Sequence, residues 1–329
     1  MNRHNLGGEG RAVALPSPVV RERALVRLRD LASPVFFLGP AGLAVVVFFL
    51  VPVLLTLWIG LTDMSVATIS NIQFVGAENY VRMLTARYTP RILQNTFFYV
   101  FTTLGLFNVG MGLAIALLTT HIEERAGTLF RTLWLLPRIT PSVIYALLWT
   151  WATADAPFGI FNQLLSPLGV TSQNWLSTQP WAIVIAANGF VGASFSMIIF
   201  TSAIKAIPQD YIVAAKVDGA STWQIICRIT VPMIRWPIMF VTAYQTLSLL
   251  TSFEYILLLT DGGPGFYRTE VWALHAFHRA LSNYFGNVQF GYGAALAAVL
   301  VVIGIIASVA YLRIFRFGQM VAEPKIEVR

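Results

Sequence analysis

Ionisable side chains are scarce in the apolar stretches of this 329-residue sequence, so the few that lie there are the first candidates for chemistry. Arg138 lies between Pro137 and Pro141, a stretch that we expect to be broken or kinked. Glu254 lies seven residues before Asp261. A charged side chain inside a membrane is costly, and it marks a functional candidate. Two alternatives stay open for each residue. It contacts a ligand, or its charge is hydrated at the edge of the membrane, at the cytoplasmic interface for Arg138 and in an outer vestibule for Glu254.

His275 and His278 are three positions apart, a spacing at which two imidazoles on one helix face can share a metal ion. No third ligand lies nearby in the sequence, so we expect two wet imidazoles on an outward-facing interfacial helix. The sequence has no phosphate-binding G-x-x-x-x-G-K-[ST] loop, no H-E-x-x-H and no G-x-S-x-G motif. Its single cysteine, Cys227, excludes an internal disulfide and a cysteine-based metal cluster. We therefore predict no catalytic residue, no metal site and no nucleotide site in this chain.

The composition indicates the environment of the chain. Hydrophobic residues make up 57% of it, charged residues only 11%, and the mean hydropathy is +0.69. A soluble domain carries about 25% charged residues, so this chain has too few to cover a water-facing surface. The composition excludes a soluble enzyme and predicts an integral membrane protein. The net charge of +7 is typical of cytoplasmic loops that face anionic lipid, and nucleic acid is not an expected partner.

Six continuous apolar segments are long enough to cross hydrocarbon as helices, which takes roughly 20 residues each. Continuous runs favour helices over the alternating strands of a membrane barrel. We therefore predict an all-α integral membrane protein with six transmembrane helices. The predicted spans cover residues 36–62, 96–120, 129–154, 181–204, 238–260 and 290–312.

Positive charge sets the predicted orientation, because Lys and Arg collect on the cytoplasmic side of a membrane. Most of the 22 Lys and Arg residues lie in the two tails and after the second and fourth spans, whereas 155–180 has none. Both termini are therefore predicted to be cytoplasmic, and 155–180 to be outside. The predicted organisation is a basic, disordered tail over 1–33, a membrane domain over 34–317 that includes a cytoplasmic segment at 205–236, and a cytoplasmic tail over 318–329.

The cytoplasmic segment between the fourth and fifth spans has more structure than a connector requires. Pro208 suits a first helical position, and Gly219 can take the left-handed conformation that ends a helix. Ser221 and Gln224 have the spacing of a capping box, which begins a second helix. The pattern predicts two short helices, joined by a turn, that dock against another molecule.

This segment resembles the EAA signature of permease subunits in ATP-binding-cassette importers, whose pattern is close to E-A-A-x-x-D-G-A followed by I-x-L-P. Val213 stands where the signature has glutamate, and Val231 stands where it has leucine. The resemblance implies the type I importer permease fold and a contact between this segment and an ATPase. The residues implied in that coupling are Ala214, Ala215, Asp218, Gly219, Ala220 and Pro232, and Ile229 is a further match.

Elements along most of the chain resemble the carbohydrate-uptake branch of this family, in particular its maltose- and glycerol-phosphate-type first permease subunit. FVGAENY (74–80) is similar to an outer element of that branch, and GIFNQLL (159–165) and NWLSTQPWA (174–182) are similar to its second outer loop. LLLTDGGPG (257–265) is similar to the end of its fifth span, and FGYGAALA (290–297) to the start of its last span. Their order and spacing imply a subunit that carries a sugar or sugar-like solute.

Small and polar residues in the fourth and fifth predicted spans could line a path for a hydroxylated solute. Gln245, Ser248 and Ser252 are spaced i, i+3, i+7 and so share one helix face. Small and hydroxyl residues also mediate helix packing in membranes, and that alternative stays open for each of them. The predicted pathway residues are Asn188, Gly192, Phe195, Ser196, Gln245, Ser248, Ser252 and Glu254.

The resemblance implies a passive pathway subunit of an importer, multi-pass in the bacterial inner membrane. The implied partners are a second homologous permease subunit, two ATPase subunits, an extracytoplasmic solute-binding protein, membrane lipid and a sugar. ATP and Mg²⁺ are expected on the ATPase subunits, and this chain is expected to hold no cofactor. The alternative function is a stand-alone secondary transporter or channel for a small polar solute. A membrane-embedded enzyme would need a convergent nucleophile, metal or acid–base set, and the sequence offers none.

Overall fold

The computed structural model describes residues 36–282 and 286–315. Within these ranges the secondary structure is helical, apart from one antiparallel bridge between Thr62 and Phe74, which confirms the predicted all-α class. The predicted tails at 1–33 and 318–329 lie outside the described residues. The chain divides into two compact units, Met1–Leu55 and Thr56–Arg329.

The helix Phe36–Ile59 provides the described part of the first unit, and no residue in it is buried. It is apolar on every face, which suits a helix surrounded by lipid. Pro52 lies near its middle and cannot donate a backbone hydrogen bond. The π-helical turn η1 (Val46–Leu50) lies just before this proline, and α2 (Val51–Ile59) continues the helix.

Among the described residues, four helices are long and apolar enough to cross a membrane: Phe36–Ile59, Thr89–His121, Pro180–Lys205 and Phe290–Ile314. They correspond to the first, second, fourth and sixth predicted spans. The pair Thr222–Met233 and Arg235–Thr251 is bent by 65° and adds a fifth crossing if it is one span.

The third predicted span, 129–154, is not one helix. It is divided among α6 (Glu124–Trp134), α7 (Leu136–Ile139) and α8 (Ser142–Ala152). Thr140 is extended, with φ −75° and ψ 132°, because the ring of Pro141 disfavours helical backbone in the residue before it. The expected break or kink between Pro137 and Pro141 is therefore confirmed, and it divides the predicted span into separate helices.

The fifth predicted span, 238–260, is also interrupted. The helix α15 (Arg235–Thr251) ends at Ser252, whose backbone is extended, and α16 (Glu254–Thr260) begins after Phe253. No proline marks this break, so the sequence pattern did not reveal it. The break brings polar backbone groups and Ser252 into the middle of an apolar segment.

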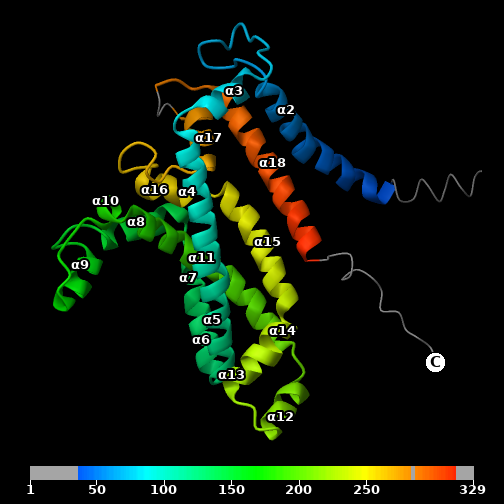
Figure 1. Ribbon diagram of the computed structural model, residues 1–329, viewed down its shortest axis with the longest axis vertical. Coiled ribbons are helices and arrows are strands. Elements are labelled where there is room, and N and C mark those ends of the chain that lie inside the picture. The colour runs from blue at the N-terminus through cyan, green and yellow to red at the C-terminus, as the bar shows by residue number, and fades with distance from the viewer. Residues whose placement is uncertain (1–35, 283–285, 316–329) are drawn as a thin grey trace, which may run out of the picture. The chain divides into compact units, whose positions relative to one another are not determined.

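The helix α11 (Pro180–Lys205) is the centre of the Thr56–Arg329 unit, and most of its residues are buried. It packs along the second span, which consists of α4 (Thr89–Thr102), the π-helical η2 (Thr103–Met111) and α5 (Gly112–His121). The two backbones approach so closely that a Cβ atom on Gly192 would lie 2.1 Å from the side-chain oxygen of Asn108. Figure 1 shows these elements side by side.

Short helices lie at both ends of the Thr56–Arg329 unit and beside its middle, where α8, α16 and the helices of residues 155–180 are found (Figure 1). At one end lie α12 (Gln209–Val217) and α13 (Thr222–Ile225), and at the other lie α3 (Glu78–Thr85) and α17 (Trp272–Ala280) (Figure 1). The last span, α18 (Phe290–Ile314), packs against α17. The remaining short elements are η4 (Ile226–Thr230) and α14 (Val231–Met233) after α13, and α9 (Ile160–Leu165), η3 (Ser166–Leu168) and α10 (Trp175–Thr178) within 155–180.

Candidate functional site

The predicted docking segment is built as two short helices joined by a turn. Gly219 follows α12 with a φ of +79°, and the N–H of Ala220 donates to the carbonyl of Ala215 at 2.9 Å. Both halves of the capping box are present: Gln224 N donates to Ser221 Oγ at 3.3 Å, and Ser221 N donates to Gln224 Oε1 at 2.8 Å. The predicted turn and cap are confirmed.

Two details of this segment differ from the expectation. Pro208 is the residue before the first helical position and not that position itself, a shift within the usual uncertainty of helix ends. The second helix does not end after one turn, because α13 continues through η4 and α14 to Met233.

Apolar side chains of this segment face away from the rest of the chain. Val217 is 82% exposed, Trp223 is 72% exposed, and Val213, which replaces the signature glutamate, is 56% exposed. Asp218 and Gly219 are exposed as well, and the Asp218 carboxylate makes no hydrogen bond to any residue that the structure describes. Exposed apolar groups around an unsatisfied carboxylate are typical of a protein-binding surface.

Two of the predicted pathway residues meet in one buried polar cluster. Asn188 on α11 donates a hydrogen bond to the hydroxyl of Tyr99 on α4 and a second one, of 3.2 Å, to Ser252 Oγ. The hydroxyls of Tyr99 and Ser252 are 3.4 Å apart. Tyr99 is completely buried and was not among the predicted site residues. Its only sequence signal was a phenol group inside an apolar span, which requires a partner when buried.

Three other predicted pathway residues pack helices together. Gln245 is buried and donates through Nε2 to the carbonyl of Gly192 at 3.0 Å. Ser196 is buried as well, with its hydroxyl 3.4 Å from the same carbonyl. The packing alternative therefore describes Gly192, Ser196 and Gln245 in this chain, and a role for them in a pathway stays a prediction.

Ser248 does not share the environment of Gln245 and Ser252, with which it was expected to share a helix face. It is exposed, whereas Gln245 is buried and Ser252 is half-buried in the cluster with Asn188 and Tyr99.

The remaining predicted residues lie on an exposed aromatic and polar face. Phe195 stacks on Tyr244 with ring centroids 5.0 Å apart, and the Arg138 guanidinium lies 5.3 Å from the Phe195 ring centroid. Glu254 is exposed at the start of α16 and accepts a hydrogen bond from the Ser142 hydroxyl. The two charges therefore sit at the ends of broken helices and not within a continuous span.

The expectation for His275 and His278 was wrong, because both imidazoles are buried and each is 1% exposed. Each ring places Nδ1 3.1 Å from Oε1 of the buried Glu270. His278 Nε2 also lies 3.0 Å from Asp261 Oδ1. The helix α17 is covered by neighbouring helices, and its two imidazoles bond to carboxylates that precede it in the chain. Sequence spacing within α17 alone could not reveal Glu270 and Asp261 as their partners.

Burial has the largest single effect on the pKa of Glu270, of His275 and of His278, and it disfavours their charged forms. It raises the pKa of Glu270, but hydrogen bonds from the two histidines outweigh it and leave that pKa below its usual value. Burial lowers the pKa of His278, but hydrogen bonds to Glu270 and Asp261 and their charge leave it above its usual value. For His275 burial prevails, and the pKa lies below its usual value.

These directions give a pH-dependent stability. A histidine with a raised pKa stabilises the folded state fully below its unfolded pKa of about 6.5, and the contribution is lost as the pH rises through the folded pKa. We therefore expect His278→Gln to lower the apparent melting temperature by more at about pH 6 than at about pH 9.

The matched control is Trp272→Phe, which changes a buried, non-titrating side chain on the same helix. Its effect on the melting temperature should be the same at both pH values. An equal loss at both pH values for His278→Gln would contradict the assignment of the raised pKa.

Comparison with known proteins adds an independent observation. Residues 108–316 match the family model described as binding-protein-dependent transport system inner membrane component. The matched range includes the docking segment, α11 and both broken helices.

Two relatives and one solved structure extend the match over most of the chain. The trehalose/maltose transport system permease protein MalF of Thermococcus litoralis is 32% identical over 282 residues, which are 85% of this chain and 92% of that protein. The alpha-glucoside transport system permease protein AglF of Rhizobium meliloti is 28% identical over 285 residues, which are 84% and 81% of the two chains. A chain in the crystal structure of a bacterial alginate ABC transporter, solved in complex with an alginate pentasaccharide-bound periplasmic protein, is 23% identical.

That chain shows the fold. It matches with a TM-score of 0.74 and covers 89% of this chain and 96% of its own length. Because the family model covers more than half of the sequence and the MalF match covers most of it, this chain belongs to the family of binding-protein-dependent transport system inner membrane components.

Proposed function

We propose that this chain is the transmembrane permease subunit of an ATP-binding-cassette importer that moves a sugar or sugar-like solute into the cytoplasm. The observation that carries the proposal is the docking segment of α12 and α13, whose turn, cap and exposed apolar residues are built to bind another protein. The sequence contains no phosphate-binding loop, so the energy of ATP must reach this chain through such a contact. The sugar class is supported by the names of the relatives, which refer to trehalose, maltose and alpha-glucoside.

The proposed partners follow from this role. A second homologous permease would complete the pathway, two ATPase subunits would bind ATP and Mg²⁺, and an extracytoplasmic solute-binding protein would deliver the solute. The exposed aromatic face supports the permease contact, because Phe240 and Tyr244 stack on each other at 6.1 Å and are both largely exposed. A periplasmic protein is part of the solved alginate transporter, which supports the third partner.

The proposed pathway runs beside the Tyr99–Asn188–Ser252 cluster. Phe195 and Tyr244 offer apolar ring faces, and Ser248 and Glu254 offer exposed polar groups nearby in the chain. Broken helices suit such a site, because an unwound backbone at membrane depth is tolerated where it lines a cavity or is buried in protein. Gly192, Ser196 and Gln245 would support the wall from behind.

A stand-alone secondary transporter is the alternative. Proton-coupled carriers usually have a relay of ionisable groups in their membrane segments. The charged residues of the six predicted spans are Arg131, Arg138 and Glu254, and no ion pair joins Glu254 to either arginine among the described residues. The family match and the docking segment favour the importer.

The importer role predicts how the turn at Gly219 responds to substitution. A side chain at a left-handed residue costs roughly 1 kcal/mol or more, and a Cβ atom there would meet no neighbour within 4 Å. We expect Gly219→Val to distort only the turn, to abolish transport and to reduce co-purification of the ATPase subunits.

Gly169 offers the matched control. It has a φ of +80°, no neighbour within 4 Å of its Cβ position, and a place in the 155–180 segment. Gly169→Val should carry the same conformational cost and leave ATPase co-purification unchanged. Normal co-purification and normal transport in Gly219→Val would place the ATPase contact elsewhere.

We further propose six membrane crossings with both termini cytoplasmic, the third and fifth crossings being made by broken helices. In a Cys227→Ser background, Thr171→Cys should react with a membrane-impermeant thiol reagent added to intact cells. In the protein that keeps its native cysteine, the exposed Cys227 should react only after the cells are permeabilised. The reverse pattern would refute the orientation.

A further inference from the structure

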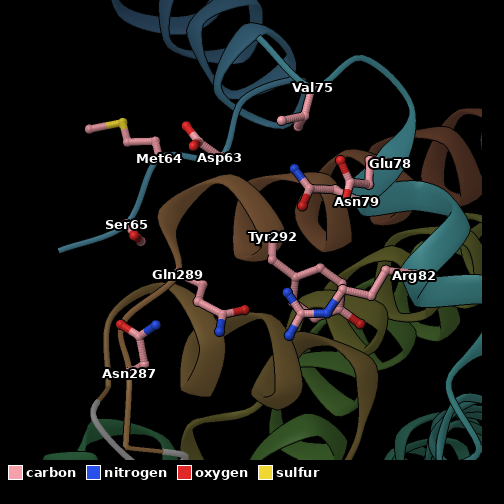
Figure 2. Close-up of a pocket in the computed structure, with 10 residues that line it drawn as sticks. All are labelled: Asp63, Met64, Ser65, Val75, Glu78, Asn79, Arg82, Asn287, Gln289 and Tyr292. Carbon is pink, nitrogen blue, oxygen red and sulfur yellow. The ribbon is translucent and has the colours of Figure 1, made fainter. Parts of the chain in front are cut away.

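A polar cavity lies at the end of the Thr56–Arg329 unit that carries α3, away from the docking segment and from the proposed pathway residues. It has a volume of about 400 Å³ and is enclosed by the loop after α2, by α3 and by the segment that enters α18. Figure 2 shows side chains from all three segments arranged around one space. Two of the family-like elements, FVGAENY and FGYGAALA, contribute to it, and the proposed function gives neither of them a role.

The walls of this cavity are held in place by hydrogen bonds within the chain. Asn79 is buried and donates through Nδ2 to the carbonyls of Gly60 at 3.0 Å and Thr62 at 2.8 Å. The N–H of Gly291, at the start of α18, donates to the carbonyl of Met64 at 2.8 Å. The cavity is therefore formed before a ligand arrives, which lowers the entropic cost of binding.

The lining combines acceptors, donors and amides. Asp63 and Glu78 supply carboxylates, and Asn79 and Gln289 add amides, of which the Asn79 amide can only accept because both of its N–H groups donate within the chain. The guanidinium of Arg82 lies 4.5 Å from the centroid of the Tyr292 ring, which holds its donors at the cavity. Gln289 Oε1 is buried beneath the wall and has no hydrogen-bond partner among the described residues.

The charges of the lining restrict the class of ligand. Two carboxylates oppose an anion, and Arg82 opposes a cation. An apolar ligand would displace water from the two carboxylates and offer them no hydrogen bond, at a cost that disfavours it. A neutral molecule with many hydroxyl groups satisfies all of them, because each hydroxyl both donates and accepts. The volume lies at the lower end of the range for small-molecule sites, which suits one or two sugar rings.

We propose that this cavity binds a neutral, hydroxyl-rich solute, a sugar or polyol, at a site separate from the translocation pathway. The assignment rests on the lining alone and stands whether or not transport is driven by ATP. Arg82 and Glu78 bind its hydroxyls from α3, Asp63 binds from the loop, and Gln289 forms part of the opposite wall (Figure 2).

Direct binding tests the proposal without any transport assay. The full-length protein in lipid nanodiscs is titrated with glucose, maltose, trehalose and glycerol, and with glucuronate as the charged counterpart of glucose, and saturation-transfer NMR reports the bound ligand. We expect at least one of the neutral compounds to bind at millimolar concentration, and to bind more tightly than glucuronate.

Two variants locate the site. Asn287 is an exposed lining residue, and Asn287→Trp should fill the cavity and weaken binding by about tenfold or more. Arg82→Met should weaken binding while keeping a side chain over Tyr292. Asn71→Trp is the control, and it should leave binding unchanged. Asn71 is exposed on the loop after α2 and does not line the cavity.

Three results would overturn the proposal. The first is that none of the neutral compounds binds the native protein, and the second is that glucuronate binds more tightly than they do. The third is that binding persists in Asn287→Trp and is lost in Asn188→Leu, which would place the sugar in the pathway. Co-purification of the ATPase subunits is measured on the same variants. Loss of solute binding tests the cavity proposal, and loss of co-purification tests the importer role, so the two outcomes are distinguishable.

Discussion

A backbone inside hydrocarbon has no water to bond with, so each polar group exposed by a break in a helix must find its partner within the protein. At the break after α15, the backbone N–H of Ser252 donates to the carbonyl of Leu249 at 3.2 Å. The Ser252 hydroxyl contacts the side chains of Asn188 and Tyr99, which reach it from two other helices. That cluster fixes α4, α11 and the junction of α15 and α16 to one another. The face with Phe195, Tyr244 and Glu254 depends on this junction, because α16 starts two residues after Ser252.

The central helix connects this cluster to the docking segment. α11 runs for 26 residues from Pro180 to Lys205 and leads directly into α12. At the end of α11 next to α12, Lys205 pairs with Glu124 at 2.7 Å, and Arg131 pairs with the same carboxylate at 3.0 Å. The hydrogen bond from Lys205 is the largest cause that holds the pKa of Glu124 below its usual value. α11 therefore joins the docking segment to the Tyr99–Asn188–Ser252 cluster as one continuous, largely buried helix.

Local sequence patterns correctly predicted the structural features that depend only on neighbouring residues. The left-handed Gly219 and the Ser221–Gln224 cap depend on residues within one turn of each other, and both were confirmed. Four of the six predicted spans correspond to long apolar helices, because length and apolarity suffice to find them. The division near Pro141 follows from proline chemistry, and the two prolines that flank Arg138 revealed it in the sequence. The break at Ser252 and the partners of Tyr99 depend on contacts between distant segments, which no single window of sequence contains.

The histidine pair also shows that local sequence cannot reveal contacts between distant segments. His275 and His278 are three residues apart, but their environment is decided by Glu270, Asp261 and the helices that cover α17. Burial reversed the expectation of wet imidazoles. The predicted pathway residues divide similarly, with Asn188 and Ser252 brought together, and Gln245 and Gly192 used for packing.

Solute uptake by lipid vesicles tests the central claim most directly. The vesicles hold the complex of this chain with its permease and ATPase partners, with ATP on the ATPase side, binding protein and sugar on the other side, and a protonophore that collapses any proton gradient. The account predicts that uptake continues with the protonophore present and stops when either ATP or the ATPase subunits are left out. Uptake by this chain in the absence of the ATPase subunits, abolished by the protonophore, would contradict it.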